Sequence, residues 1–547
     1  MINGKSDGNI RADAGTQVMG GLLPAMLRPG MQRGLIVGLG TGSTAGWFAA
    51  VPEVQRVDVV ELEPATLEMA RLCASANLNV LENPKVRVHI ADAREVLLST
   101  RESYDFIFSE PSNPYRAGIA SLFTRDFYEA ATRRLTPNGV FAQWLQAYEI
   151  DGQAVRSAFA TLGSVFPNVQ TWQTQGGDFI LIASNSPITL DAEALKQRIG
   201  QEPFRSALIN AWQVDTLEGV LAHFIAGEQL TRVVVQSGVT PITDDRNSLE
   251  FGFARTVGRR AGERMSDQLH KVALDHACAV PVIRGAVDWE AVNNQILAAG
   301  LRTITPTSTK AEESPAVARR AFIQAYLKEE FEYARREWNN KPFEPRSLLE
   351  LSAVAESLAR TGDPQAWRFI EQLYAVSPHE AEALVAAAFA SEKRWPEATE
   401  HLQNTFAAWQ SDPWPRMELI GHTLALAEYV AKASKQPSIA KVLYESIQKP
   451  FAVGLAWDNR IASMLKIAQS VDSQAVSICV NEALKEYGNN FPWQRWLLQL
   501  RVQAYQTSND PRLQSAIEDL LRFSAAEMQP FDRGLRVPNQ PALAKQP

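Results

Sequence analysis

The sequence predicts an α/β domain with a doubly wound parallel sheet, followed by an all-helical domain. Short β-branched runs alternate with helix-like segments over residues 33–190, a pattern typical of a parallel sheet covered by helices on both faces. A glycine-rich turn follows the first run, and no convincing strand pattern occurs over residues 316–528. With 547 residues, the chain is long enough for about three or four structural units, or two large ones.

The α/β region contains six predicted strands, and helix-like segments such as 64–77 and 124–135 lie between them. Ligands of such sheets bind beyond the carboxyl ends of the strands, so we expect the functional residues there. The predicted strands are 35–40, 57–63, 86–92, 104–111, 139–146 and 178–184.

The composition suggests four parts along the chain. We expect an α/β domain over 1–258, a helical connection and linker over 259–315, an all-helical repeat-like domain over 316–528, and a disordered tail over 529–547. The linker ends in TITPTSTKAEESP, which is rich in Thr, Pro, Ser and charge.

The helical domain is predicted from segments separated by the turns TGDP, SPHE, SDPWP and SNDP. Around 379–413, the spacing of Phe389, Ala398 and Leu402 resembles a tetratricopeptide repeat. Paired helices of this kind cannot bury their apolar faces alone, so an array is expected.

Charge and cysteine content exclude several classes of protein. The net charge of −7 and pI of about 5.7 leave no basic excess for nucleic acid or anionic lipid. Cys73, Cys278 and Cys479 lack the spacing of a zinc site or a disulfide framework, and the seven histidines lack metal-ligand spacing, so no metal is expected. We expect a soluble protein of the reducing cytoplasm that recognises a small molecule or a protein.

No membrane span is expected in this chain. The start lacks the apolar core of a signal peptide. Residues 34–52 form the one uncharged stretch that approaches membrane length, and they contain GLGTGSTAG, which is too polar and glycine-rich for a good spanning helix.

The strongest chemical signal is LIVGLGTGSTAG. Gly38, Gly40 and Gly42 follow a buried strand and open a helix, which allows a tight turn and close approach of a ligand. Ser43 stands where the dinucleotide fingerprint GxGxxG needs glycine, so that fingerprint fails. The alternative is a glycine turn that serves packing only.

Two acids end the next two predicted strands. Glu61 can accept both ribose hydroxyls of an adenosine, and Asp92 can accept a hydrogen bond from an adenine amino group. Each alone is weak evidence, because strand-end acids are often solvated. Together with the glycine turn they indicate a Rossmann-like fold with a nucleoside site of the S-adenosylmethionine type.

The fourth predicted strand ends in SEPSNP, which places Glu110, Asn113 and Pro114 at the same edge of the sheet. A carboxylate there can accept a proton from an attacking amine or hold an ammonium group. The alternative is a capping and turn segment before the next helix.

These motifs resemble the polyamine aminopropyltransferases, the spermidine and spermine synthases. The resemblance runs in order from residue 2 to about 255 through NGKSDGNIRADAGTQVMGGLLPAML, LIVGLGTG, VVELEP, IADARE, YDFIFSEPSNP, LFTRDFYEAATRRLTPNGVFAQWLQ and ITDDRNSLEF. It is similar to bacterial synthase-like proteins fused to other modules, in which a membrane region often precedes the synthase domain and helical repeats follow. Since the motif begins at residue 2, we expect that region to be absent here.

The resemblance implies decarboxylated S-adenosylmethionine as a co-substrate, a polyamine acceptor, no permanently bound cofactor, and a homo-oligomer. It implies Glu110 as the base, with Asn113, Asp244 and Asp245 on the amine side, although a turn-capping role for the last two is equally compatible. The implied donor-site residues are Gln17, Gly38, Gly40, Thr41, Gly42, Glu61, Leu62, Asp92 and Ala93.

The amine half departs from the family. Thr41 replaces the Asp that binds the aminopropyl ammonium, Asn113 replaces the second Asp of the catalytic motif, and Thr16 replaces a Tyr. A charge pair at 4 Å is worth roughly 4 kcal/mol at an effective dielectric of 20, before desolvation is subtracted. The nucleoside half is therefore kept and the amine half is altered.

Three functions remain open at this stage. The leading one is aminopropyl transfer from decarboxylated S-adenosylmethionine to a polyamine amine. Thr41 and Asn113 favour another S-adenosylmethionine-dependent transferase, such as a methyltransferase, since Thr41 would not repel the carboxylate of the intact donor. The third is a non-catalytic nucleoside-binding scaffold whose helical array recruits a protein. The expected location is cytoplasmic, with membrane association only through a separate module.

Overall fold

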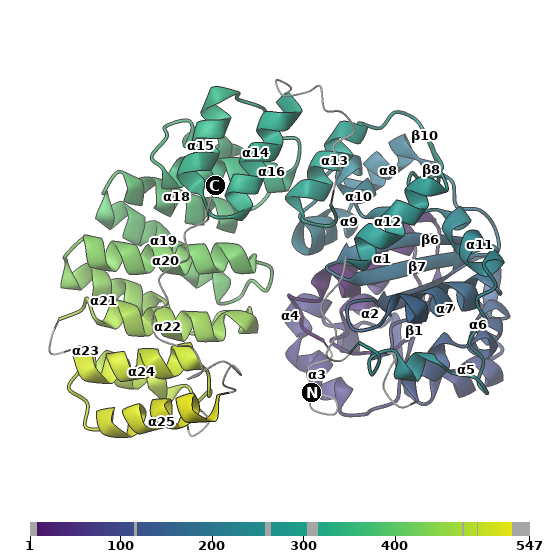
Figure 1. The fold of residues 1–547 in the computed structure, drawn as a ribbon, viewed down its shortest axis with the longest axis horizontal. Coiled ribbons are helices and arrows are strands. Elements are labelled where there is room, and N and C mark those ends of the chain that lie inside the picture. The colour runs from purple at the N-terminus through teal and green to yellow at the C-terminus, as the bar shows by residue number, and fades with distance from the viewer. Residues whose placement is uncertain are drawn as a thin grey trace, which may run out of the picture. The chain divides into compact units, whose positions relative to one another are not determined.

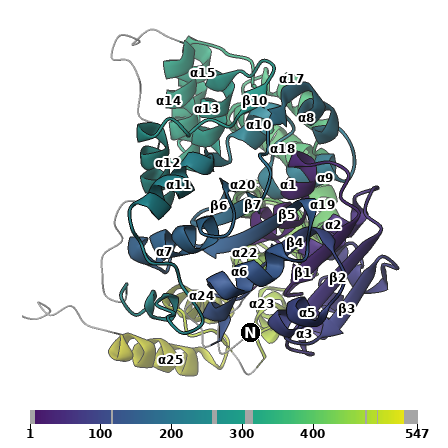
Figure 2. The same ribbon diagram turned by 90° about the vertical axis from the view of Figure 1, so that its right-hand side faces the viewer.

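The computed structural model contains an eight-stranded sheet in the order β3-β2-β1-β4-β5-β7-β6-β9, which Figure 2 shows from β6 to β3. The first five strands of the chain run parallel, and β7, β6 and β9 pair antiparallel at one end. This confirms the doubly wound α/β prediction. The strands are β1 (Arg33–Val37), β2 (Arg56–Glu61), β3 (Val86–Ile90), β4 (Tyr104–Ser109), β5 (Leu135–Gln146), β6 (Asn168–Gln175), β7 (Asp178–Ser184) and β9 (Phe224–Ala226).

The structure describes residues 8–113, 118–256, 264–303, 315–472, 475–488 and 491–527. The predicted tail over 529–547, residues 259–263 and 304–314 of the predicted connection and linker, and Pro114 lie outside these residues. The chain divides into two compact units, one of residues 1–391 with 411–416, and the other of residues 392–410 with 417–547.

Helices cover both faces of the sheet, as Figure 1 shows. Among the described residues a further short parallel pair is formed by β8 (Leu190–Asp191) and β10 (Ile283–Arg284). The helices of this part are α1 (Ala14–Leu27), α2 (Ser43–Ala50), α3 (Thr66–Leu72), α4 (Ala74–Asn77), α5 (Ala93–Ser99), α6 (Arg125–Thr132), α7 (Gly152–Gly163), α8 (Ala192–Ile199), α9 (Phe204–Ala207), α10 (Leu217–Leu221), α11 (Glu228–Gln236), α12 (Met265–Asp275) and α13 (Trp289–Ala298).

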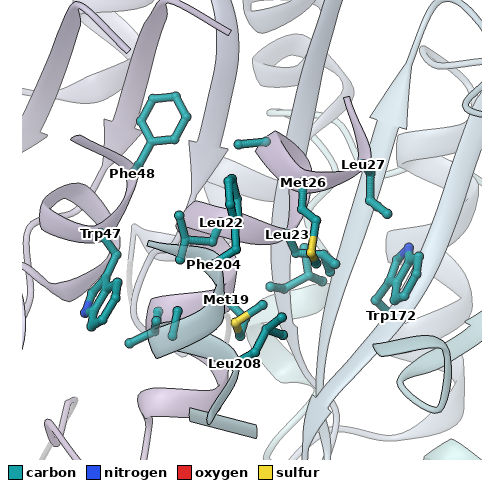
Figure 3. Packing of buried hydrophobic residues seen from close by; sticks show 14 of the residues in the cluster. Met19, Leu22, Leu23, Met26, Leu27, Trp47, Phe48, Trp172, Phe204 and Leu208 are labelled. Carbon is teal, nitrogen blue, oxygen red and sulfur yellow. The ribbon is translucent and has the colours of Figure 1, made fainter. Parts of the chain in front are cut away.

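Helix α1 is buried along its whole length and organises one face of the sheet. Its side chains pack among Trp47, Phe48 and Trp172, as seen in Figure 3. Burial of each large apolar side chain stabilises the fold by about 1.5–3 kcal/mol. Gly21 allows α1 to approach α2 closely, because a Cβ there would lie 2.5 Å from the carbonyl oxygen of Thr44.

The described residues from 315 to 527 contain helices and no strand, as predicted. None of the described helices is long and apolar enough to cross a membrane. The likeness to tetratricopeptide repeats stays a prediction. The first unit holds α14 (Pro315–Leu327), α15 (Phe331–Asn340), α16 (Leu348–Arg360), α17 (Ala366–Tyr374) and α18 (Pro378–Ser391). The second holds α19 (Trp395–Trp409), α20 (Met417–Ala433), α21 (Pro437–Ser446), α22 (Trp457–Ala468), α23 (Val476–Lys485), α24 (Arg495–Thr507) and α25 (Leu513–Ala526).

Candidate functional site

The candidate site lies where β1, β2 and β4 end. Val37 of β1 pairs with Ser109 of β4, so the glycine turn and Glu110 are neighbours. Gly38 has φ +97°, and a Cβ there would lie 2.8 Å from the carbonyl oxygen of Glu110. Since L side chains rarely adopt this conformation, the position requires glycine on both grounds. The fold therefore holds the glycine turn directly against Glu110.

Glu61 is buried beside the same turn. Its Oε2 accepts a hydrogen bond from the Leu39 N–H at 2.9 Å, and its Oε1 accepts one from the Glu63 N–H at 2.8 Å. These two backbone donors fix the orientation of the carboxylate. Each carboxylate oxygen can accept a second hydrogen bond, so Glu61 can still receive two hydroxyls.

Asp92 and its neighbours form the far side of the candidate nucleoside site. Asp92 caps α5, because its Oδ1 accepts a hydrogen bond from the Arg94 N–H at 2.7 Å. This contact occupies one carboxylate oxygen, and the second oxygen can accept a hydrogen bond from a ligand. Ala93 is buried, while Leu62 is 70% exposed directly after Glu61. An exposed leucine at this place can cover one face of a planar base.

The structure joins Thr41 to Gln17, which comes from α1. The Thr41 hydroxyl donates to Gln17 Oε1 at 2.6 Å and lies 2.9 Å from the Ser43 hydroxyl. The Asn77 amide donates to the Thr41 carbonyl at 2.8 Å. Thr41 is 1% exposed, so its hydroxyl holds the turn together. The residue that replaces the family's Asp is thus engaged within the protein.

Glu110 is tied to α2. The Thr44 hydroxyl lies 2.5 Å from Glu110 Oε2 and donates to it, and the same hydroxyl is 2.9 Å from the Gln17 carbonyl. Burial raises the pKa of Glu110 to about 7, with the Thr44 hydrogen bond opposing the rise and the charges of Asp13 and Asp178 adding to it. A carboxyl that titrates near neutral pH is well suited to accept a proton.

Asp178 is a further acid that the sequence analysis did not identify. It begins β7, opposite Gln146 at the end of β5, and is 6% exposed. Trp144 Nε1 donates to its Oδ1 at 3.0 Å. Burial raises the pKa of Asp178 to about 7, the Trp144 hydrogen bond lowers it, and the charge of Asp13 raises it.

Asp13 is the third carboxylate of this group and was also missed. It precedes α1, and its Oδ2 accepts a hydrogen bond from the Asn9 N–H at 2.7 Å. Its charge acts on both Glu110 and Asp178. Asp13 precedes α1, Glu110 follows β4 and Asp178 begins β7, so the three acids are brought together by the fold. They are far apart in the sequence, and no local spacing links them. Three mutually repelling carboxylates form an environment that favours a bound cation.

The remaining predicted amine-side residues are Asn113, Asp244 and Asp245. Asn113 is buried at 4% exposure. Asp244 forms an ion pair with Arg94 and accepts a hydrogen bond from the Thr124 hydroxyl at 2.8 Å. Arg94 lowers the pKa of Asp244. Asp245 is exposed in the same turn. The ion pair supports the structural alternative for Asp244.

The N-terminal third of the chain is similar to known polyamine aminopropyltransferases. Residues 16–175 match the spermine/spermidine synthase domain. The polyamine aminopropyltransferase of Nitrosomonas europaea is 30% identical over 187 residues, which cover 33% of this chain and 57% of that protein. The polyamine aminopropyltransferase of Alkaliphilus metalliredigens is 27% identical over 155 residues, which cover 28% of this chain and 54% of that protein. The chain thus spans little more than half the length of the curated relatives that it matches.

Among solved structures, a spermidine synthase in complex with the transition-state analogue AdoDATO is 22% identical to this chain. The match has a TM-score of 0.30 and covers 32% of this chain and 61% of that one.

Proposed function

We propose, from the match of residues 16–175 to the spermine/spermidine synthase domain, that this chain transfers an aminopropyl group from decarboxylated S-adenosylmethionine to a polyamine amine. One observation carries the proposal. Glu110 lies against the glycine turn, titrates near neutral pH, and is surrounded by the charges of Asp13 and Asp178.

The donor would bind through its nucleoside. Glu61, already oriented by two backbone N–H groups, would accept the ribose hydroxyls. Leu62 and Ala93 would contact the adenine ring, and the free oxygen of Asp92 would accept from the adenine amino group. The turn formed by Gly38, Gly40 and Gly42 would lie next to the sulfonium side of the donor, with Gln17 and Thr41 holding that turn in place.

The acceptor would bind through the acidic group. The family's two missing carboxylates correspond to Thr41 and Asn113, and we propose that Asp13 and Asp178 supply the lost negative charge from other elements. One ammonium of a diamine would face Asp178, while the other amine approaches Glu110. This arrangement explains how an acceptor cation is held although the family's own acids are replaced.

The chemistry follows from these positions. The amine nitrogen attacks the methylene carbon next to the sulfonium, and a C–N bond forms as the C–S bond breaks. The bonding electrons go to sulfur, so methylthioadenosine leaves. Glu110 accepts the proton released by the amine, which at a pKa of about 7 it can do near neutral pH.

A second candidate is a methyltransferase that uses intact S-adenosylmethionine. It is favoured by Thr41, whose neutral hydroxyl is engaged by Gln17 and would not repel the carboxylate of the intact donor. A third is a nucleoside-binding scaffold that recruits a protein through its helices.

The test compares donors and products. The purified chain is titrated calorimetrically with S-adenosylmethionine and with its decarboxylated form, and each mixture is assayed with putrescine for methylthioadenosine. Tighter binding of the decarboxylated donor with product formation supports the proposal. Equal or tighter binding of the intact donor with inert putrescine favours the methyltransferase, and binding without turnover of any acceptor favours the scaffold.

Glu110→Gln should lower kcat by about 10²–10⁴ while donor binding stays near the wild-type value. Glu193→Gln is the matched control, because Glu193 is a largely exposed glutamate on α8. Equal turnover in the two variants would remove Glu110 from the reaction.

A further inference from the structure

The segment Ser411–Arg416 connects two helices of the C-terminal region, yet it belongs to the compact unit that contains the sheet. We propose that this segment is a positioning element for the candidate site. Through Trp414 and Pro415 it holds the two pieces of backbone that carry Thr44 and Asp13. The expected kinetic effects rest on the proposed function. The positioning itself rests on the contacts that Trp414 and Pro415 make.

The first contact is between two tryptophans. Trp414 packs edge to face on Trp47, with ring centroids 5.9 Å apart and planes at 73°. Trp47 lies on α2, is 3% exposed, and donates from Nε1 to the Ala76 carbonyl at 2.9 Å. Residues three apart on a helix are neighbours on its surface, and Trp47 is three residues after Thr44. Trp414 therefore packs against the turn of α2 that carries Thr44, whose hydroxyl donates to Glu110.

The second contact is made by the turn before α1. Arg11 Nε donates to the Pro415 carbonyl at 2.9 Å. Asn9 Oδ1 accepts hydrogen bonds from the N–H groups of Arg11 and Ala12, both at 2.9 Å, and the Asn9 N–H donates to Asp13. Fixing Arg11 thus fixes the turn that presents the Asp13 carboxylate.

The segment is itself firmly anchored within this unit. Arg416 forms a buried ion pair with Glu380 of α18 and donates to the Ser352 hydroxyl of α16 at 2.6 Å. Asp412 Oδ1 accepts from the Trp414 N–H at 3.0 Å, and its Oδ2 lies 2.8 Å from His379 Nδ1. Helices α16 and α18 are thereby connected to α2 through one short stretch of chain.

The sequence of the segment suits this role. Pro413 and Pro415 flank Trp414, and each fixes its own φ angle near −65°. The residue before a proline is held in an extended conformation, which restricts Asp412 and Trp414 as well. A short, stiff segment passes a displacement of α16 or α18 on to Trp47 and Arg11. A flexible loop would change its own conformation instead.

The experiment uses the full chain and three variants. Trp414→Ala removes the ring contact, Trp414→Phe keeps a smaller aromatic edge, and Arg11→Gln removes the cation that donates to Pro415. Trp457→Ala is the control, because Trp457 is 44% exposed at the start of α22. For each protein we would measure the melting temperature, methylthioadenosine affinity, KM for putrescine, kcat, and amide hydrogen exchange over residues 9–13 and 43–50.

We expect Trp414→Ala to raise KM for putrescine or to weaken nucleoside binding by about fivefold, which corresponds to the free energy of one aromatic pair. Amide hydrogen exchange in α2 should become faster. Trp414→Phe should recover most of the loss. Trp457→Ala should match wild type, and Arg11→Gln should speed exchange in the 9–13 turn.

Unchanged exchange in both segments and kinetics within twofold of the control would overturn the inference, as would a loss of activity that only follows the fraction of unfolded protein. If Trp414→Ala fails to fold, Arg11→Gln decides by the same readouts. If the wild-type chain neither binds nucleoside nor turns over putrescine, the proposed function fails, and the exchange rates alone decide whether Trp414 and Arg11 position these segments.

Discussion

Trp144 Nε1 donates a hydrogen bond to Asp178 Oδ1 at 3.0 Å, from a strand that pairs antiparallel with the one that Asp178 begins. The indole, together with the side chains of Gln175 and Thr16, orients a buried carboxylate. Its orientation matters because the charges of Asp178 and Asp13 both act on Glu110. The acidity of the site is thus distributed over α1, β4 and β7.

Asp178→Asn should raise KM for putrescine by roughly tenfold, because about 1.4 kcal/mol of attraction between the carboxylate and an ammonium is lost. Affinity for methylthioadenosine should stay within twofold, since that ligand carries no ammonium. Steady-state kinetics and calorimetry check the two values. An equal loss of both would indicate general damage to the fold, and no change in KM would exclude Asp178 from acceptor binding.

The pH dependence of kcat/KM should report the ionisation of Glu110 together with that of Asp178, because burial raises the pKa of both carboxyls to about 7. A base must be unprotonated to act, so kcat/KM should fall as pH drops below about 7 and rise as pH increases through that value. Thr44→Val removes the hydrogen bond that favours the charged carboxylate, so the ascending limb should move to higher pH. Thr399→Val, on α19, is a control with the same change of side chain. A limb that does not move in Thr44→Val would contradict the assignment.

The strand pattern predicted most of the sheet because β1, β2, β4 and the second half of β5 are apolar runs buried on both faces. The edge strand β3 is largely exposed, and its alternating Val and Ile residues still gave a strand pattern. It missed β6, whose sequence NVQTWQTQ reads as polar. Gln170 and Gln173 of β6 are nevertheless buried, since their amides find backbone partners: Gln170 donates to the Ile188 carbonyl at 3.1 Å and Gln173 to the Leu301 carbonyl at 2.8 Å. Those partners are distant in sequence, so no local pattern reveals them.

The candidate site was predictable where it follows strand ends and unpredictable where it depends on packing. Glu61 and Glu110 lie near the C-terminal ends of two predicted strands, and the structure places both beside the glycine turn. Asp178 was hidden because it pairs across a hairpin with the unrecognised β6. Thr41 shows the opposite case: the sequence places it in the donor turn, and only the structure reveals that its hydroxyl is bonded to Gln17.

His223 should make the protein sensitive to acid. Burial lowers the pKa of His223 to about 3, with its hydrogen bond to Gln173 opposing and the Arg302 charge adding to the effect. His223 in the unfolded chain therefore binds a proton at a pH at which His223 in the native state stays neutral. The free energy of unfolding falls as pH drops from about 6.5 towards 3. Between pH 7 and pH 5 the loss from this residue is about 2 kcal/mol.

His223→Gln keeps a polar side chain without the titration, so the decrease in urea midpoint between pH 7 and pH 5 should be smaller than in wild type. Its absolute stability at pH 7 is expected to fall, because His223 stacks on Trp212 with ring centroids 3.7 Å apart. His276→Gln, at an exposed position, serves as the control. An unchanged pH dependence in His223→Gln would show that His223 does not govern acid sensitivity.

Gly21→Ala should destabilise the fold and disturb the site together. The added Cβ would lie 2.5 Å from the Thr44 carbonyl and 3.3 Å from Phe48 Cβ, and a backbone oxygen cannot rotate away. Helix α1 must then separate from α2, at a cost of about 1–3 kcal/mol that exceeds the gain of ~1 kcal/mol in helix propensity. Since α2 carries Thr44, the hydrogen bond to Glu110 should lengthen and kcat should fall.

Gly421→Ala is the matched control, because Gly421 lies within α20 and an added Cβ would meet no atom within 4 Å. It should stabilise the protein by up to ~1 kcal/mol through helix propensity alone. Urea unfolding and putrescine turnover are measured for both variants. If Gly21→Ala were as stable and as active as Gly421→Ala, the close approach of α1 and α2 would not be what holds Thr44 against Glu110.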